Sequence, residues 1–301
     1  MGALEGRVAV ITGAGRGLGR EHALLFAAEG ARLVINDLGG GPDGSGSDAT
    51  PAQQVVEEIR AAGGEAVANS DDVTSADGAQ RMIQQAIDAF GALHVLVNNA
   101  GILRDRTIVN MTDDEWDDVI RVHLRGHFMP ARAAARYWRE QSKAGNSLQP
   151  SLINTTSTSG LFNNPGQSNY GSAKTGIATL TIIAQRELGR YGVKVNAIAP
   201  AARTRLTVAT PGISEAILHA PAEGFDAMDP ANVSPFVAYL ATADCPIGGR
   251  IFFVAGGSIH LFQPFAIIDG ISKEGRWTVQ ELATEAARLA DVPFDLGQPS
   301  L

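Results

Sequence analysis

The stretch Arg7-Val-Ala-Val-Ile-Thr-Gly-Ala-Gly-Arg-Gly-Leu-Gly19 decides the fold of this 301-residue chain. It begins with a short apolar, β-prone run that ends at Thr12, continues as a glycine-rich turn and leads into an apolar, helix-spaced segment through Ala28. Glycines permit a tight turn and a close backbone approach to a pyrophosphate, which then faces the N-terminus of the helix. A strand, a glycine-rich turn and a helix in this order are typical of a dinucleotide-binding unit, whereas a glycine cluster alone is weak evidence.

An acidic residue follows this turn at the spacing expected for ribose recognition. The run from Ala31 to Asp37 indicates a second strand, and its last residue lies eighteen positions after Gly19. A carboxylate there hydrogen-bonds the adenosine ribose and repels a 2′-phosphate, so Asp37 favours NAD over NADP. Arg16 argues the other way, because an arginine near the phosphates tolerates NADP, but a solvated loop arginine explains it equally well. The alternative for Asp37 is a solvated side chain that opens the loop from Gly39 to Gly46.

Five further apolar runs, separated by helix-length segments, bring the number of expected strands to seven. They lie near residues 65–72, 93–98, 151–157, 193–198 and 250–255. Short apolar runs bounded by Gly, Asn and Asp predict a parallel sheet covered on both faces, and right-handed crossovers make it doubly wound. We therefore predict an α/β fold of the Rossmann type, a seven-stranded parallel sheet with helices on both faces, over residues 1–257. Its ligand crevice would lie beyond the carboxyl ends of the strands.

Tyr170 and Lys174 form a candidate proton-transfer pair. Residues at i and i+4 share one face of a helix, so the Lys174 ammonium can lie beside the Tyr170 phenol. A nearby cation favours the phenolate and brings its pKa down from about 10 toward neutrality. Ser157, thirteen residues before Tyr170, would hold the substrate oxygen. A Tyr-x-x-x-Lys pair alone is better explained by an amphipathic helix, and the glycine-rich turn and Asp37 are what favour catalysis here.

These motifs resemble those of the short-chain dehydrogenase/reductase family. They stand in the family's order as Thr12-Gly13-x-x-x-Gly17-x-Gly19, Asp72-Val73, Asn98-Asn-Ala-Gly101, Ser157 and Tyr170-x-x-x-Lys174. The resemblance covers residues 4–257 and implies reversible hydride transfer between NAD and a secondary alcohol. It also implies that Asp72 lies near the adenine, that the segment from Asn98 to Gly101 lines the cofactor cleft, and that Lys174 holds the nicotinamide ribose.

The candidate site therefore has two sets of residues and NAD as its expected cofactor. The catalytic set is Ser157, Tyr170, Lys174 and His123. The cofactor-binding set is Thr12, Gly13, Gly15, Arg16, Gly17, Leu18, Gly19, Asp37, Asp72, Val73, Asn99, Ala100, Gly101, Tyr170, Lys174 and Pro200. We expect no metal ligands.

His123 is where the chain departs from the family pattern. Many members place an asparagine in the segment that here reads Val122-His123-Leu124, where it supports a water chain leading away from the catalytic lysine. Two interpretations of the histidine stay open. It relays protons with a pKa near neutrality, or it is a buried neutral imidazole hydrogen-bonded to a carbonyl group.

Five segments carry a closer resemblance: Val34 to Gly40, Val56 to Ile59, Asn99 to Arg106, Arg121 to Gly126, and Gly166-Gln167 before Asn169-Tyr170. They look like the (3R)-hydroxyacyl-CoA dehydrogenase units of peroxisomal multifunctional β-oxidation enzymes, some of which also act on 17β-hydroxysteroids. The resemblance implies an acyl-CoA substrate in fatty-acid or sterol side-chain breakdown, with a hydroxysteroid or another lipophilic alcohol as the alternative. A protein that only senses NAD is a third hypothesis, but it needs none of the catalytic residues.

Composition limits the partners and the compartment. A net charge of −8 without a basic cluster argues against nucleic acid, whereas coenzyme A would need local cations. Arg104 and Arg106, or Arg203 and Arg205, are candidates for that role, although each is also explained as a solvated loop residue. No apolar stretch is long enough to span a bilayer, and the lone Cys245 suits a reducing compartment. We expect a cytoplasmic protein.

Two segments lie outside the family's shared motifs. Residues 201–235 are rich in Pro and Gly around brief apolar runs such as Ile213 to Ala220, which favours a substrate lid over an ordinary surface loop. Residues 258–301 form an extension, in which Thr278-Val-Gln-Glu281 is a capping box that opens a helix. The resemblance implies a homodimer or homotetramer, and the extension packs on a neighbouring subunit or on its own domain.

Overall fold

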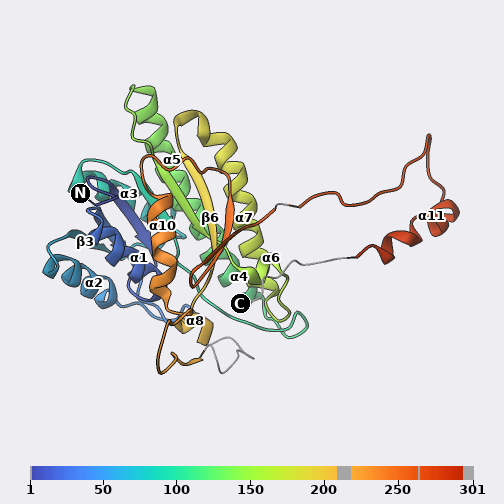
Figure 1. Ribbon diagram of the computed structural model, residues 1–301, viewed down its shortest axis with the longest axis horizontal. Coiled ribbons are helices and arrows are strands. Elements are labelled where there is room, and N and C mark those ends of the chain that lie inside the picture. The colour runs from blue at the N-terminus through green and yellow to red at the C-terminus, as the bar shows by residue number, and fades with distance from the viewer. Residues whose placement is uncertain (1, 209–217, 264, 294–301) are drawn as a thin grey trace. The chain divides into compact units, whose positions relative to one another are not determined.

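The computed structural model describes residues 2–208, 218–263 and 265–293 (Figure 1). A first compact unit ends at Leu261 and holds a sheet with the strand order β3-β2-β1-β4-β5-β6-β7-β8. The strands are β1 (Val8–Thr12), β2 (Arg32–Asn36), β3 (Glu65–Asn69), β4 (Val95–Asn98), β5 (Ser151–Thr155), β6 (Lys194–Ala201), β7 (Ile251–Ala255) and β8 (Ser258–Leu261). The order reverses between β1 and β4, so the crevice at their carboxyl ends is the expected ligand site of such a sheet.

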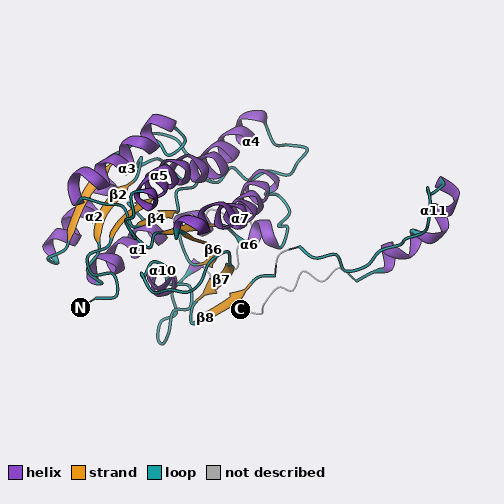
Figure 2. Ribbon diagram, turned by 90° about the horizontal axis from the view of Figure 1, so that it is seen from above, coloured by secondary structure: helices purple, strands orange, loops and turns teal. Residues whose placement is uncertain are grey.

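Helices cover both faces of the sheet, and Figure 2 shows the two layers. One layer contains α1 (Gly17–Ala28), α2 (Thr50–Ala61) and α10 (Ser234–Leu240), and the other contains α3 (Ala76–Phe90), α5 (Gly126–Lys143) and α7 (Ser168–Leu188). Successive strand residues face opposite sides, so each strand supplies two cores. On β1, Ala9 and Ile11 enter the first core, whereas Val8 and Val10 enter the second.

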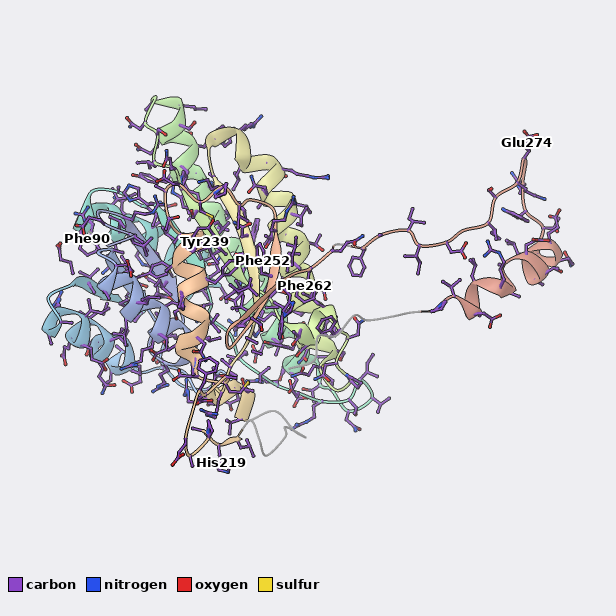
Figure 3. The ribbon with its side chains drawn as sticks, in the orientation of Figure 1. Phe90, His219, Tyr239, Phe252, Phe262 and Glu274 are labelled. Atoms are coloured by element: carbon purple, nitrogen blue, oxygen red, sulfur yellow. The ribbon has the colours of Figure 1, made fainter. Side chains whose placement is uncertain are left out.

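Shorter helices lie mainly around the carboxyl ends of the strands. They are α4 (Asp113–Ile120), a π-helical segment (Arg121–Arg125), α6 (Thr158–Leu161), α8 (Arg205–Val208) and 3-10 turns at Gly189–Tyr191 and Pro230–Val233. Helix α10 packs on β7 through Phe236 and Phe252, whose ring centroids are 4.9 Å apart. Figure 3 labels Phe252 and also Tyr239 of α10, whose ring centroid lies 6.2 Å from that of Phe236.

The predicted doubly wound sheet with helices on both faces is confirmed, and seven of its strands run parallel. The structure adds β8, an antiparallel edge strand that we had assigned to the C-terminal extension. Gly256 and Gly257 form the turn between β7 and β8. All four side chains of β8 are exposed, so the strand has no buried alternation by which the sequence could reveal it.

The second unit begins at Phe262. The predicted capping box is present, because Thr278 Oγ1 accepts from Glu281 N and the Glu281 side chain accepts from Thr278 N. It opens α11 (Val279–Glu285), which a 3-10 turn at Ala287–Asp291 follows. The surface on which this unit packs stays a prediction. Within the described ranges, the helices lack the length and apolar character that a bilayer crossing requires.

Candidate active site

The glycine-rich turn joins β1 to α1 and is closely packed. Gly13 has a φ of +63°, and a Cβ added there would lie 2.8 Å from the Ala100 Cα. A Cβ on Gly19 would lie 2.2 Å from the Gly13 carbonyl oxygen. Both positions therefore require glycine, as the sequence pattern predicts.

Thr12 and Asn99 fasten this turn to the loop after β4. The Thr12 hydroxyl accepts hydrogen bonds from the backbone N–H groups of Asn99 (3.0 Å) and Ala100 (3.1 Å). In return, the Asn99 side chain donates to the carbonyls of Thr12 and Gly13, both at 3.1 Å. The two loops therefore form one rigid wall at the reversal of strand order.

Asp37 lies at the end of β2 and faces the glycine-rich turn. Its Oδ2 accepts from Gly15 N at 2.8 Å, and its Oδ1 accepts from Gly39 N at 2.7 Å. These bonds fix the carboxylate at the rim of the hollow, so it is not the freely solvated side chain of the alternative interpretation. Arg16 and Arg205 also line this hollow, and their charges act on each other.

The hollow is open to solvent and spans about 1150 Å³ including its mouth. The predicted residues that line it are Gly13, Arg16, Gly17, Leu18, Asp37, Asp72, Val73, Asn99, Ala100 and Gly101. Thr12, Gly15, Gly19, Tyr170, Lys174 and Pro200 are not in the lining; the first three shape the turn, Tyr170 and Lys174 lie on α7, and Pro200 lies in β6. Further lining residues that sequence reasoning missed are Asn36, Leu38, Gly40, Gly41, Pro42, Gly44, Asp71, Ile102, Arg121 and Val122. The close-packed glycines and the fixed carboxylate fit a bound dinucleotide.

The Asn98 side chain does not line the cleft, contrary to the prediction. We predicted that the whole segment from Asn98 to Gly101 lines it, but the Asn98 side chain is fully buried and points into the interior. Its Nδ2 donates to the His127 carbonyl (3.1 Å) and to Asn154 Oδ1 (3.0 Å). The reason is strand geometry, since Asn98 is the last residue of β4 and Asn99 is the first of the loop.

Ser157, Tyr170 and Lys174 come together at the carboxyl end of β5. Ser157 is the N-cap of α6 and hydrogen-bonds the Tyr170 phenol, while Tyr170 and Lys174 share one face of α7. The Lys174 Nζ lies 5.4 Å from the centroid of the Tyr170 ring and donates to the Thr155 carbonyl at 2.7 Å. The helical spacing thus places phenol and ammonium side by side, as predicted.

The acidities of these groups differ from our expectation. Burial raises the pKa of Tyr170 to about 12; the Ser157 hydrogen bond opposes this change and the Asp105 carboxylate adds to it. Burial also lowers the pKa of Lys174 to about 7. The prediction that Lys174 brings the phenol toward neutrality is therefore wrong for this structure, because desolvation of the phenolate outweighs the nearby cation.

His123 lies in the π-helical segment, a local widening of the helix that is common at functional sites. Its ring meets the Tyr170 ring edge-on, with centroids 5.0 Å apart. The Nε2 atom lies 2.7 Å from the Ile102 carbonyl oxygen, and a Cβ on Gly101 would lie 2.3 Å from the ring. Gly101 therefore makes room for this histidine.

Burial and the Lys174 charge lower the pKa of His123 well below its usual range, so the ring is neutral at physiological pH. This is the second of our two interpretations, a buried imidazole hydrogen-bonded to a carbonyl. A part for His123 in catalysis stays a prediction.

Asp105, Gln167 and Asn169 are site residues that sequence reasoning did not single out. The Gln167 side chain donates to Asp105 Oδ2 at 2.7 Å, and the Asn169 side chain donates to the carbonyls of Arg104 and Glu115, both at 2.9 Å. These bonds clamp the loop after β4 onto the first turn of α7, just before Tyr170. Asp105 and Gln167 lie in segments that carry the closer resemblance, and Gln167 and Asn169 flank Ser168 immediately before Tyr170, but neither signal assigned them a role.

Most of the candidate coenzyme A arginines are engaged elsewhere. Arg104 pairs with Asp118 (3.1 Å), Arg106 pairs with Glu115 (3.3 Å), and Arg203 pairs with Asp226. Arg205, at the start of α8, lines the hollow instead.

Of the predicted lid, the described part includes Thr204, Arg205 and Leu206, which line the hollow. Residues 213–217 of the apolar run from Ile213 to Ala220 lie outside the described residues. Lid motion stays a prediction.

Comparisons with known proteins agree with this geometry. Residues 7–211 match the short chain dehydrogenase family. Hydroxyacyl-CoA dehydrogenase ChsB1 of Mycobacterium tuberculosis is 42% identical over 287 residues, which are 93% of this chain and 87% of that protein. Peroxisomal multifunctional enzyme type 2 of Drosophila melanogaster is 45% identical over 253 residues, which are 84% of this chain but 39% of that protein.

A solved structure of similar fold is a short chain dehydrogenase from Mycobacterium avium, with a TM-score of 0.85 and 48% identity over 100% of this chain and 98% of that one. The resemblance to hydroxyacyl-CoA dehydrogenases and peroxisomal multifunctional enzymes is thereby confirmed. The chain belongs to the short-chain dehydrogenase/reductase family, which uses NAD or NADP, and is an oxidoreductase that acts on CH–OH groups.

Proposed function

We propose that this protein interconverts a (3R)-hydroxyacyl-CoA and a 3-oxoacyl-CoA with NAD, in the breakdown of fatty acids or sterol side chains. The observation that carries the proposal is the convergence of Ser157, Tyr170 and Lys174 at the carboxyl end of β5 in a family of NAD(P)-linked oxidoreductases. The similarity to a hydroxyacyl-CoA dehydrogenase and to peroxisomal multifunctional enzymes supports the substrate class.

The preference for NAD rests on Asp37. The glycine-rich turn and the N-terminus of α1 would hold the pyrophosphate, the Asp37 carboxylate the adenosine ribose, and Lys174 the nicotinamide ribose. A 2′-phosphate would meet a carboxylate that two backbone N–H groups already fix in place. Bound NAD would supply the hydride acceptor in alcohol oxidation and the hydride donor in ketone reduction.

The side chains of the chain itself handle the proton. In oxidation, the Tyr170 phenolate takes the proton from the substrate hydroxyl, and in reduction the Tyr170 phenol returns it to the carbonyl oxygen. Ser157 donates a hydrogen bond to that same oxygen and orients it. Because burial raises the pKa of Tyr170 to about 12, the phenol form prevails at neutral pH and is ready to donate in the reductive direction.

Replacement of Tyr170 by Phe tests these assignments. We expect turnover of (3R)-3-hydroxyacyl-CoA, followed as NADH formation, to fall by at least about 10²-fold, because the variant lacks the proton-transfer group. NADH binding, followed by fluorescence, should stay near the wild-type value, since the ring volume and Lys174 are retained. Loss of both turnover and NADH binding in a variant with normal thermal unfolding would contradict the role of Tyr170.

The state of assembly and the compartment are part of the same proposal. We place the protein in the cytoplasm, for which its single, buried, free Cys245 is suited. We infer a homodimer or homotetramer built on α5 and α7, which light scattering of the full chain would test.

A further inference from the structure

The helical run from Asp113 to Lys143 separates charge along its length. It consists of α4, the π-helical segment and α5, which follow one another without a break. The acidic residues of α4 are Asp113, Asp114, Glu115, Asp117 and Asp118. The Arg, Lys and Glu residues of α5 are Arg132, Arg136, Arg139, Glu140 and Lys143. The run is therefore acidic where it begins and basic where it ends.

A hollow at the ends of α5 and α7 gathers five arginines. Arg132, Arg136 and Arg139 line it from one face of α5, at the helical spacing i, i+4, i+7. Arg186 of α7 and Arg190 of the 3-10 turn that follows line it as well, and the lining contains only one carboxylate. Within the described ranges, neither Arg136 nor Arg186 has an ion pair. The positive charge of this hollow is thus largely uncompensated, in a chain whose net charge is −8.

The face between the two charged ends is apolar. Leu124 of the π-helical segment packs on α7 at Gly176, where an added Cβ would lie 3.2 Å from Leu124 Cδ1. Phe128 of α5 is 41% exposed and Ile183 of α7 is 47% exposed. The Arg132 guanidinium lies over the Phe128 ring, 5.5 Å from its centroid, so the apolar part adjoins the arginine hollow. Exposed apolar side chains rimmed by charges are typical of a protein–protein interface.

The acidic helix α4 lies at the other end of this face. The Asn169 side chain, in the first turn of α7, donates to the Glu115 carbonyl at 2.9 Å. Asp113 and Asp117 share one side of α4, are exposed, and have no ion pair among the described residues. In Figure 1, α4 lies low in the first unit, whereas α5 and α7 end at the top. Acidic, apolar and basic parts thus succeed one another along α4, α5 and α7.

A second copy of the chain can cover this face in two ways, because a two-fold interface brings the same patch of both copies together. If the axis runs along the helices, like ends meet and the two arginine hollows oppose each other. If the axis crosses the helices, the acidic end of each copy meets the arginine hollow of the other. Opposed like charges cost free energy at an interface, whereas opposite charges favour the encounter and fix its register. Charge therefore selects the crossed axis.

We propose that this face binds a second copy of the chain turned end for end, so that α4 of each copy docks at the arginine hollow of the other. The apolar parts around Phe128 and Ile183 then cover each other between the two charged contacts. The inference rests on the proposed homodimer and adds to it an orientation, a part for α4 and a reason for the five arginines. It is independent of the substrate.

Charge reversal at either end tests the proposal, with the dissociation constant of the full-length dimer measured by sedimentation over a dilution series. Arg136→Glu with Arg186→Glu should weaken the dimer by at least about tenfold, and Asp113→Lys with Asp117→Lys should do the same. The two pairs change net charge in opposite directions, so net charge cannot explain a shared effect. All four substitutions in one chain restore opposite charges at both contacts and should return the dissociation constant to near the wild-type value.

Thermal unfolding of each variant controls for folding. A dimer that withstands both reversals would overturn the inference, as would a four-substitution chain that dissociates as readily as the reversed pairs. Stabilisation of an unchanged dimer by inorganic pyrophosphate, lost in the arginine variant, would assign the hollow to a small anion instead. A monomeric wild-type chain would contradict the proposed assembly together with this inference. A wild-type dimer with the expected charge effects but no turnover would contradict the proposed activity alone.

Discussion

The proposed chemistry depends on the acidity of a single phenol, that of Tyr170. Tyr170 has two neighbours that act on it in opposite directions, since the Ser157 hydrogen bond favours the phenolate and the Asp105 carboxylate disfavours it. Asp105 is itself half-buried, and burial raises its pKa. Asp105 therefore acts on the pKa of Tyr170, although the sequence marked it only as part of the segment from Asn99 to Arg106 and gave it no part in the site.

Replacement of Asp105 by Asn should make Tyr170 more acidic. A group that must be deprotonated gains activity as pH rises toward its pKa, so a lower Tyr170 pKa moves the rise of alcohol oxidation to lower pH. Asn keeps an oxygen that accepts from Gln167, so the clamp on α7 survives. The pH profile of kcat/KM checks this, with Asp105→Glu as the charge-retaining control. A profile unchanged in Asp105→Asn would contradict the electrostatic role.

The preference for NAD over NADP can be tested at the single residue Asp37. We expect Asp37→Asn to raise the kcat/KM ratio of NADP⁺ to NAD⁺ by about tenfold or more, which corresponds to about 1.4 kcal/mol, because the variant no longer repels the 2′-phosphate. Arg16 and Arg205 line the same hollow and would then face the 2′-phosphate. Asp72→Asn removes the same charge elsewhere in the hollow and should leave the ratio nearly unchanged. Equal effects of the two variants would show that net charge, not Asp37, selects the cofactor.

The parts of the site that lie within one helix, strand or turn could be predicted from the sequence, whereas contacts between distant elements could not. Glycine positions, the carboxylate at the end of β2 and the i, i+4 pair on α7 follow from local periods and spacings, which a sequence displays directly. The clamp between Asp105 and Gln167 spans 62 positions, and the π-helical turn that directs His123 at Tyr170 has no local signature. Burial also belongs to the folded state, which is why the pKa of Tyr170 moved against expectation.

Thr12 and Asn99 form a joint between the glycine-rich turn and the loop after β4, and this joint leads to a prediction at the element scale. Thr12→Val keeps the shape of the side chain but leaves the N–H groups of Asn99 and Ala100 without their acceptor. Each unsatisfied buried group costs about 1–3 kcal/mol, so we expect the free energy of unfolding to fall by at least about 2 kcal/mol. Urea denaturation measures this. Thr12→Ser retains the hydroxyl and should lose far less; equal losses would mean that methyl packing, not hydrogen bonding, holds the joint.

At the scale of the whole molecule, one large α/β unit carries the entire candidate site. Both cores lie in the unit that ends at Leu261, and the residues that line the hollow come from β1 through α8. The alternation of strands and helices predicted this arrangement, whereas β8 and the boundary after it depended on exposed residues without a pattern.

The most direct test of the account is the initial rate of NADH formation with matched (3R)- and (3S)-hydroxyacyl-CoA epimers and 17β-hydroxysteroids, each repeated with NADP⁺. We predict rapid turnover of the (3R)-acyl-CoA with NAD⁺, with the (3S) epimer and NADP⁺ each slower by at least about tenfold. Turnover of steroids or other free alcohols alone would contradict the acyl-CoA assignment while leaving Ser157, Tyr170 and Lys174 in their roles. Tight NAD binding without turnover of any of these alcohols would contradict the central claim.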